Sequence, residues 1–132
     1  MDNETWEPQD GTIVNPEEGR IRPGGVLGRR ALLLALSEPL FGTTFLLDGP
    51  RTLIGRSSAC TVVLDDPLVS REHCAVELDE EGLYWLEDLG SKNATVLNRK
   101  HLTRRSQLFY GDRIVLGDTV LRFFLEERVD RK

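Results

Sequence analysis

Three short polar clusters carry the side chains of this sequence that are best suited to binding chemistry. They are Gly55-Arg56, Ser70-Arg71-Glu72-His73 and Gly90-Ser91-Lys92-Asn93-Ala94-Thr95. Arginine offers a planar fork of donors, serine a hydroxyl, lysine an ammonium group, and asparagine an amide that both donates and accepts. An anion with several acceptor oxygens fits this set of groups, so the clusters predict a binding site for such an anion.

The elements that must position these clusters are short apolar runs bounded by Gly, Pro, Asp and Ser, a pattern typical of strands. Strands are expected at residues 31–36, 43–47, 52–54, 61–64, 73–78, 83–89, 95–97, 101–102, 107–109, 113–116 and 119–126. None of these runs has a convincing helical period, so they predict an all-β fold, a two-sheet β-sandwich of about ten to eleven strands. The polar clusters then fall in loops, where binding groups are usually found.

The composition indicates a soluble globular domain. The chain has 132 residues, 39% hydrophobic and 30% charged. It has no apolar run near the roughly 20 residues that a membrane-spanning helix needs, and its start lacks the features of a signal peptide. We therefore expect a cytoplasmic protein that has no membrane partner.

Charge is distributed unevenly along the chain. Residues 1–19 contain six acids and no Lys or Arg, which leaves 17 basic and 16 acidic residues, a formal charge of +1, for residues 20–132. A nearly neutral module does not favour nucleic acid as a partner, because nonspecific binding to phosphates requires a strong basic excess. The first 30 residues also contain Pro8, Pro16, Pro23 and Gly24-Gly25, and we expect a flexible acidic tail there.

The two cysteines, Cys60 and Cys74, lack the clustered spacing of zinc ligands. We expect reduced core residues, with no metal and no cofactor.

In their order along the chain, the three clusters and the following Asn98 resemble the forkhead-associated (FHA) family, a phosphothreonine-binding module. The likeness extends over residues 31–126 and leaves 127–132 as the start of a charged linker or C-terminal tail. It implies two packed sheets with the binding loops at one end. It also implies a noncatalytic signalling function, in which the domain recruits a phosphorylated partner or its own phosphorylated tail and regulates an attached effector.

The resemblance also assigns roles to the polar residues. Arg56 and Ser70 are expected to bind the phosphate, Lys92 to add a phosphate or peptide contact, and Asn93 to hold the peptide backbone. Arg71, beside Ser70, is a further candidate for peptide contact. Each also has a simpler interpretation, as a solvated charge for the basic side chains and as a turn residue for Ser70 and Asn93.

Three residues are expected to support the loops. Gly55 would let the backbone turn sharply before Arg56, His73 would brace the loops without touching phosphate, and Asn98 would tie two loops together. Ala94 departs from the glycine that the family usually has, and positive φ there would cost alanine roughly 1 kcal/mol or more. Arg99 and Lys100 are expected either to extend a basic rim or to be solvated.

Thr5 and Thr12, each set among acids, are candidate phosphosites for an upstream Ser/Thr kinase. Phosphorylated, either could bind the Arg56 loops in cis or between two copies. The alternative is an acidic leader that only improves solubility.

Three other functions compete with phosphothreonine binding. An enzyme would need a nucleophile, a base and an orienting group, which Ser70, His73, Asp112 and the cysteines do not form in sequence. A nucleotide site would need a glycine-rich phosphate-binding motif, which the chain lacks. A scaffold with a decayed phosphate site, acting through other protein contacts, is the remaining alternative.

Overall fold

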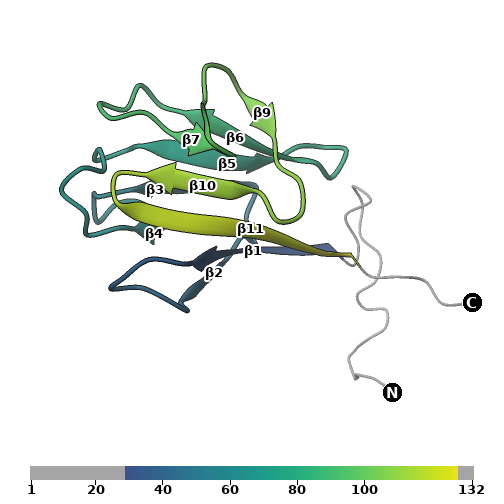
Figure 1. The fold of residues 1–132 in the computed structure, drawn as a ribbon. Coiled ribbons are helices and arrows are strands. Elements are labelled where there is room, and N and C mark those ends of the chain that lie inside the picture. Colours follow the sequence, from purple (N-terminus) through teal and green to yellow (C-terminus); the bar gives the residue numbers. More distant parts are fainter. Residues whose placement is uncertain (1–28, 128–132) are drawn as a thin grey trace, which may run out of the picture. The chain divides into compact units, whose positions relative to one another are not determined.

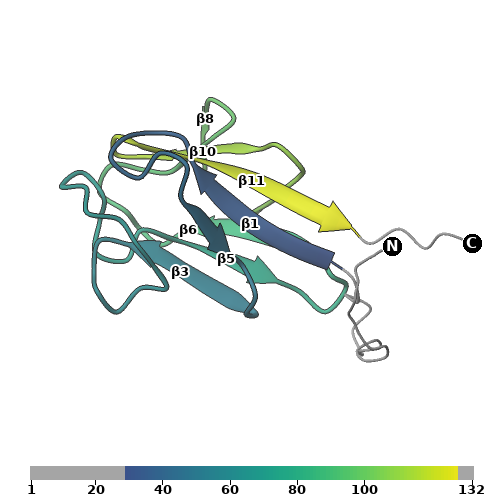
Figure 2. The same cartoon turned by 90° about the horizontal axis from the view of Figure 1, so that it is seen from below.

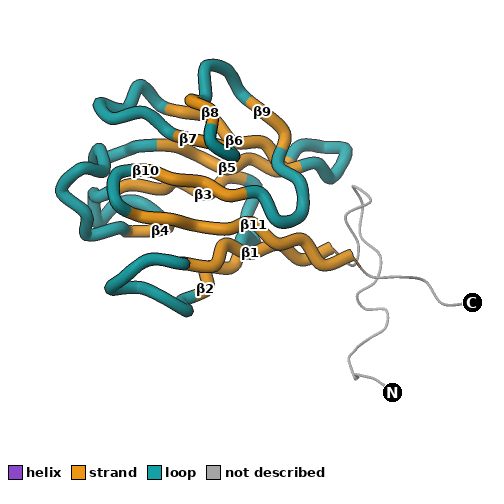
Figure 3. The backbone as a smooth tube through the Cα atoms, in the orientation of Figure 1, coloured by secondary structure: helices purple, strands orange, loops and turns teal. Residues whose placement is uncertain are grey.

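The computed structural model describes residues 29–127, which contain eleven strands and no helix (Figure 3). The strands are β1 Arg29–Ala35, β2 Thr44–Leu46, β3 Arg51–Gly55, β4 Val62–Val63, β5 Cys74–Leu78, β6 Tyr84–Asp88, β7 Val96–Leu97, β8 Lys100–His101, β9 Ser106–Gln107, β10 Arg113–Leu116 and β11 Thr119–Glu127. Each corresponds to one of the runs expected from sequence, so the all-β prediction is confirmed. Five of the strands contain only two or three residues.

The strands form two sheets, with orders β2-β1-β11-β10-β7-β8 and β4-β3-β5-β6-β9. The two sheets lie as separate layers in Figures 1 and 2. Their facing side chains form one core, and the rings of Tyr84 (β6) and Phe123 (β11) meet across it with centroids 5.5 Å apart. The predicted two-sheet β-sandwich is therefore present within residues 30–79 and 83–125.

Alternation along the strands explains which residues enter this core. On β10 and β11 the buried apolar side chains are Ile114, Leu116, Leu121 and Phe123. The residues between them, such as Arg113 and Arg122, lie on the outer face, because successive side chains of a strand point to opposite sides. The two-residue connection Gly117-Asp118 closes the β10–β11 hairpin, as expected.

Strand direction brings the three polar clusters to one end of the sandwich. β3 and β6 each run antiparallel to β5, so the end of β3, the start of β5 and the end of β6 lie together. We call the loops that follow or precede these ends the site loops, residues 56–61, 64–73 and 89–95. The β10–β11 hairpin reaches the same end, on the left in Figure 1.

Both cysteines are buried free thiols, as predicted. Burial raises the pKa of Cys74 to about 12, with the nearby Asp88 carboxylate adding to the effect. Between residues 29 and 127, no group of three or more His, Cys, Asp or Glu side chains could hold a metal ion. The same range contains no helix that is long and apolar enough to cross a membrane. The predicted acidic tail, including Thr5 and Thr12, and residues 128–132 lie outside the described residues.

Candidate functional site

Arg56 follows β3 and is fixed by its backbone and by one of its guanidinium nitrogens. The Arg56 amide donates to the Ser70 carbonyl (2.9 Å), which continues the β3 pairing into the loop before β5. Arg56 Nε donates to the Val69 carbonyl (2.9 Å). Within the described part of the chain, the two terminal amino groups have no partner, and the side chain is exposed. The head of Arg56 is therefore oriented and still has free donors.

Gly55 supports this arrangement for a different reason from the one expected. Its φ is not positive, so the prediction that glycine allows a sharp turn was wrong. Instead, a Cβ at this position would lie 2.1 Å from the Arg71 carbonyl oxygen. Glycine is needed because the loop before β5 passes directly over the β3 backbone, and any side chain would push the loop away.

His73 is fully buried and joins two site loops through its ring. The Ser70 amide donates to His73 Nδ1 (3.0 Å), and His73 Nε2 lies 2.8 Å from the Ala94 carbonyl. An amide only donates and a carbonyl only accepts, so Nδ1 carries no proton and Nε2 carries one. These contacts correspond to the bracing role that the resemblance implied for His73.

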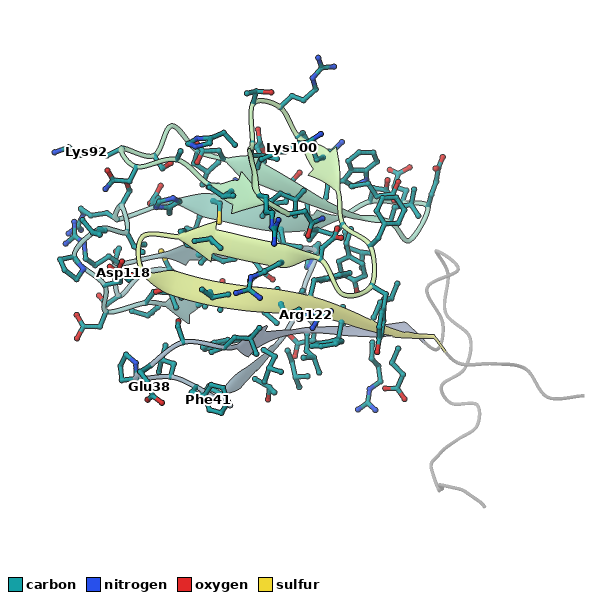
Figure 4. All side chains as sticks on the ribbon, in the orientation of Figure 1. Glu38, Phe41, Lys92, Lys100, Asp118 and Arg122 are labelled. Atoms are coloured by element: carbon teal, nitrogen blue, oxygen red, sulfur yellow. The ribbon has the colours of Figure 1, made fainter. Side chains whose placement is uncertain are left out.

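Ser70 and Asn93 use part of their hydrogen-bonding capacity within the site. The Lys92 amide donates to Ser70 Oγ (3.0 Å), which leaves the hydroxyl proton of Ser70 available. Asn93 Nδ2 donates to the Leu68 carbonyl (2.9 Å). Its Oδ1 has no partner among residues 29–127. The Lys92 side chain is exposed and points away from the sandwich (Figure 4).

Ala94 has φ of 67°. The loop therefore keeps the left-handed conformation for which glycine is better suited, and does not change its turn to avoid the cost. That cost is about 1 kcal/mol, since Cβ crowds the backbone in this region.

Asp88 holds the last site loop and was not identified from the sequence. Its carboxylate accepts from the amides of Gly90 and Ser91 and from the hydroxyls of Ser91 and Thr95, at 2.5–3.0 Å. Burial alone would raise the pKa of Asp88, but these hydrogen bonds to the charged form outweigh it and lower the pKa. An Asp three residues before a Ser, at the end of a strand, is a recognisable turn signal.

Asp66 was also missed, and it ties the loop before β5 to the other sheet. It accepts from the Leu68 amide (2.9 Å), the Asp118 amide (2.8 Å) and the Thr119 hydroxyl (2.8 Å). Burial opposes ionisation of Asp66, yet these three donors lower its pKa. Asp118 and Thr119 are more than 50 residues away, so no local pattern could have identified this anchor.

Asn98 lies apart from the residues above. It donates from Nδ2 to Asp112 Oδ1 and accepts through Oδ1 from the Arg113 amide, each at 2.9 Å. It therefore connects the β7–β8 turn to the start of β10, at the end of β7 away from Asn93. The side chain of Arg71 is exposed, while its carbonyl accepts from the Ser57 amide (3.1 Å).

The chain was also compared with known proteins. The model of the FHA domain family matches residues 52–117, which include Arg56, Ser70 and Asn93. The chain is 36% identical over 106 residues to the glycogen accumulation regulator GarA of Mycolicibacterium smegmatis, which covers 80% of this chain and 66% of that protein. It is 38% identical over 104 residues to the oxoglutarate dehydrogenase inhibitor of Corynebacterium jeikeium, covering 76% and 71%.

Among solved structures, EmbR of Mycobacterium tuberculosis in complex with a low affinity phosphopeptide superposes with a TM-score of 0.68. The sequence identity is 26%, and the match covers 77% of this chain and 26% of EmbR. This chain thus spans about two thirds of the first two relatives and corresponds to one part of the third.

Proposed function

The chain belongs to the FHA domain family, and we propose that it is a noncatalytic module that binds phosphothreonine segments of a partner protein. The observation that carries this proposal is the set of hydrogen-bonding groups left unused at the site loops. Arg56 keeps its terminal amino groups, Ser70 its hydroxyl proton and Asn93 its Oδ1, while the remaining atoms of these side chains are fixed by the loops.

Arg56 and Ser70 supply the contacts to the phosphate. A phosphothreonine carries nearly two negative charges and three acceptor oxygens, so removing it from water requires charged donors in a fixed geometry. The Nε contact of Arg56 with Val69 orients the guanidinium without using its terminal donors. Because little side-chain freedom is then lost on binding, more of the interaction contributes to affinity.

Lys92, Arg71 and Asn93 act on the peptide around the phosphate. The exposed ammonium of Lys92 adds charge, and Arg71 is available for the residues that flank the phosphothreonine. The free Oδ1 of Asn93 accepts from a peptide amide.

Preference for threonine over serine would come from an apolar niche for the γ-methyl group of threonine, since burying one methyl group contributes about 0.8 kcal/mol.

The partner is a protein phosphorylated by a Ser/Thr kinase, or the chain's own N-terminal segment phosphorylated at Thr5 or Thr12. The names of two relatives, a regulator of glycogen accumulation and an inhibitor of oxoglutarate dehydrogenase, support a role in which binding changes the activity of a partner. Such a role requires no chemistry within this module.

The test is fluorescence anisotropy of the full chain with matched phosphothreonine, phosphoserine and unphosphorylated peptide pools. Binding confined to phosphothreonine is expected, with loss in Arg56→Ala and strong weakening in Arg56→Lys, which keeps the charge but removes the fork. Arg104→Ala is the matched control, because Arg104 is exposed and its side chain makes no hydrogen bond or ion pair within residues 30–126. Phosphate-independent binding, or none, would contradict the proposal and leave the scaffold alternative.

A second arm tests the tail. Phosphopeptides centred on Thr5 and Thr12 are titrated into the Thr5→Ala, Thr12→Ala double variant, which cannot occupy its own site. Binding that depends on Arg56 supports the tail as a partner. If both peptides fail while the pools bind, the partner is another protein.

A further inference from the structure

A second group of arginines lies on the outer face of the six-stranded sheet, away from the site loops. Arg113 (β10) and Arg122 (β11) are direct cross-strand partners, and Arg99 occupies the β7–β8 turn. We call these three the arginine row. Arg122 lies on β11 roughly 13 Å from the hairpin residue Asp118, at about 3.3 Å per residue, and Figure 4 shows both.

The arginine row borders an open hollow. Val96, Arg99, Arg113 and Val115 line a depression of about 380 Å³. Val96 and Val115 are cross-strand partners on β7 and β10. The floor of the hollow is therefore apolar, and arginines stand on one side of it.

Among residues 30–126, no acid forms an ion pair with the arginine row. In the described range 29–127, the ion pairs within 4.0 Å are those of Glu77 with Arg51 and Arg105, and both involve the other sheet. Asp112 is the nearest acid in sequence, but Oδ1 accepts from Asn98 and Oδ2 from the Phe109 amide. All three arginines are exposed, so their charges face solvent without an acidic partner among the described residues.

Arg113 and Arg122 place like charges opposite each other, which we expect to lower the stability of the free protein. Like charges placed directly opposite each other on neighbouring strands repel, at a cost of a few tenths of a kcal/mol or more. Arg122 is held in place, because its Nε donates to the Gly111 carbonyl (2.9 Å) and its guanidinium lies 5.7 Å from the Phe124 ring. Arg99 adds a left-handed backbone, with φ of 74°, where such turns favour glycine. Local features that oppose folding are typical of functional sites.

We propose that the arginine row and its hollow form a second binding surface, which takes an acidic segment of a partner protein independently of phosphorylation. Carboxylates would pair with the three guanidiniums, and the aliphatic parts of acidic or neighbouring side chains would cover Val96 and Val115. An extended protein segment fits this open hollow and the strand beside it better than a small molecule, which needs a site that encloses most of its surface. With a formal charge of +1, residues 20–132 lack the strong basic excess that nonspecific binding to nucleic acid or to anionic lipid requires.

The experiment titrates the full chain with a labelled glutamate-rich peptide and with its glutamine counterpart. The glutamate peptide alone is expected to bind, and Arg113→Glu with Arg122→Glu should weaken it about tenfold or more, since each exposed ion pair contributes up to about 1 kcal/mol. The matched control, Arg104→Glu, makes the same charge change as Arg113→Glu alone, in the loop before β9 of the other sheet, and should leave binding nearly unchanged. Arg56→Ala should also leave it unchanged.

Several results would overturn the proposal. If Arg104→Glu weakens peptide binding as much as Arg113→Glu does, only net charge matters. If Arg56→Ala abolishes peptide binding, the acidic peptide occupies the site loops. Stronger row-dependent binding to phosphatidylserine vesicles or to DNA would assign the surface to another class of partner. A variant with the six acids of residues 1–19 changed to their amides tests self-occupancy. If these changes make peptide binding markedly tighter, the chain's own segment is the occupant rather than a partner.

Discussion

The site loops present Arg56 to solvent and the arginine row presents Arg113, but these two side chains are held in different ways. Arg56 lies where three loops meet, and one of its nitrogens is tied to the Val69 carbonyl. Arg113 is held only by its strand and faces Arg122 across the ladder. Loops that are cross-linked by hydrogen bonds present a few groups at fixed positions, which suits recognition of one phosphate. A flat sheet with unpaired charges suits a less selective contact with acidic groups.

The contrast predicts that substitutions in or directly beside the site loops change stability strongly, whereas those in the arginine row change mainly charge. Gly55→Ala is expected to have the largest effect, a loss of about 3 kcal/mol of unfolding free energy, because the new methyl meets the Arg71 carbonyl. Urea denaturation measures it. Gly49→Ala, where a Cβ meets nothing within 4 Å, is the control. A loss no greater than that of the control would mean that the loop before β5 moves freely.

Asp66→Asn comes next, with an expected loss of about 2 kcal/mol, because an amide cannot accept from the donors on both sides of the carboxylate. The substitution should also change the pH dependence. Folding lowers the pKa of Asp66, so its contribution is present above about pH 4 and is lost as the pH falls below that value. Urea denaturation is measured from about pH 2 to about pH 7. Toward acid pH, the unfolding free energy of the variant should fall less steeply than that of the parent protein. If the unfolding free energy of the variant falls as steeply as that of the parent protein, a group other than Asp66 causes the loss of stability at acid pH.

Ala94→Gly should stabilise the protein by up to about 1 kcal/mol, since it removes the crowding of a left-handed alanine, less the entropy that glycine adds to the unfolded chain. Thermal unfolding measures the gain, and phosphopeptide binding should persist. A lower melting temperature would mean that the Ala94 methyl makes contacts that outweigh the backbone strain.

Arg113→Glu should give the smallest change, a stabilisation of about 0.5 kcal/mol, because an opposite-charge pair with Arg122 replaces a like-charge pair. The same variant should bind the glutamate-rich peptide less tightly. A variant that is more stable but binds the peptide less tightly would distinguish the arginine row from an ordinary solvated surface. High salt should reduce the stability difference, and a salt-independent difference would rule out repulsion as its cause.

Much of the fold could be predicted because strand and turn signals are local. Each expected run became a strand, and Gly117-Asp118 closes a two-residue hairpin. The contacts of Asp66 could not be predicted, since its partners Asp118 and Thr119 become neighbours only when the sheets pack. The role of Gly55 was misassigned for a related reason. A side chain at position 55 is excluded by the carbonyl of Arg71, 16 residues away, rather than by the backbone conformation of residue 55 itself.

The sequence by itself determined the all-β class and the residues of the site loops, because alternation, turn residues and the ordered polar clusters are properties of short segments. The tertiary structure decided which atoms of those residues are left free to bind. That depends on the partners each side chain finds in other loops, as when Val69 takes one nitrogen of Arg56 and Leu68 takes the amide of Asn93. It also brought Arg99 into the arginine row, since the β7–β8 turn reaches Arg113 only through the pairing of β7 with β10, whereas the Arg113–Arg122 pair belongs to the local hairpin. Pairing between distant segments is set by packing of the whole domain, and no local pattern encodes it.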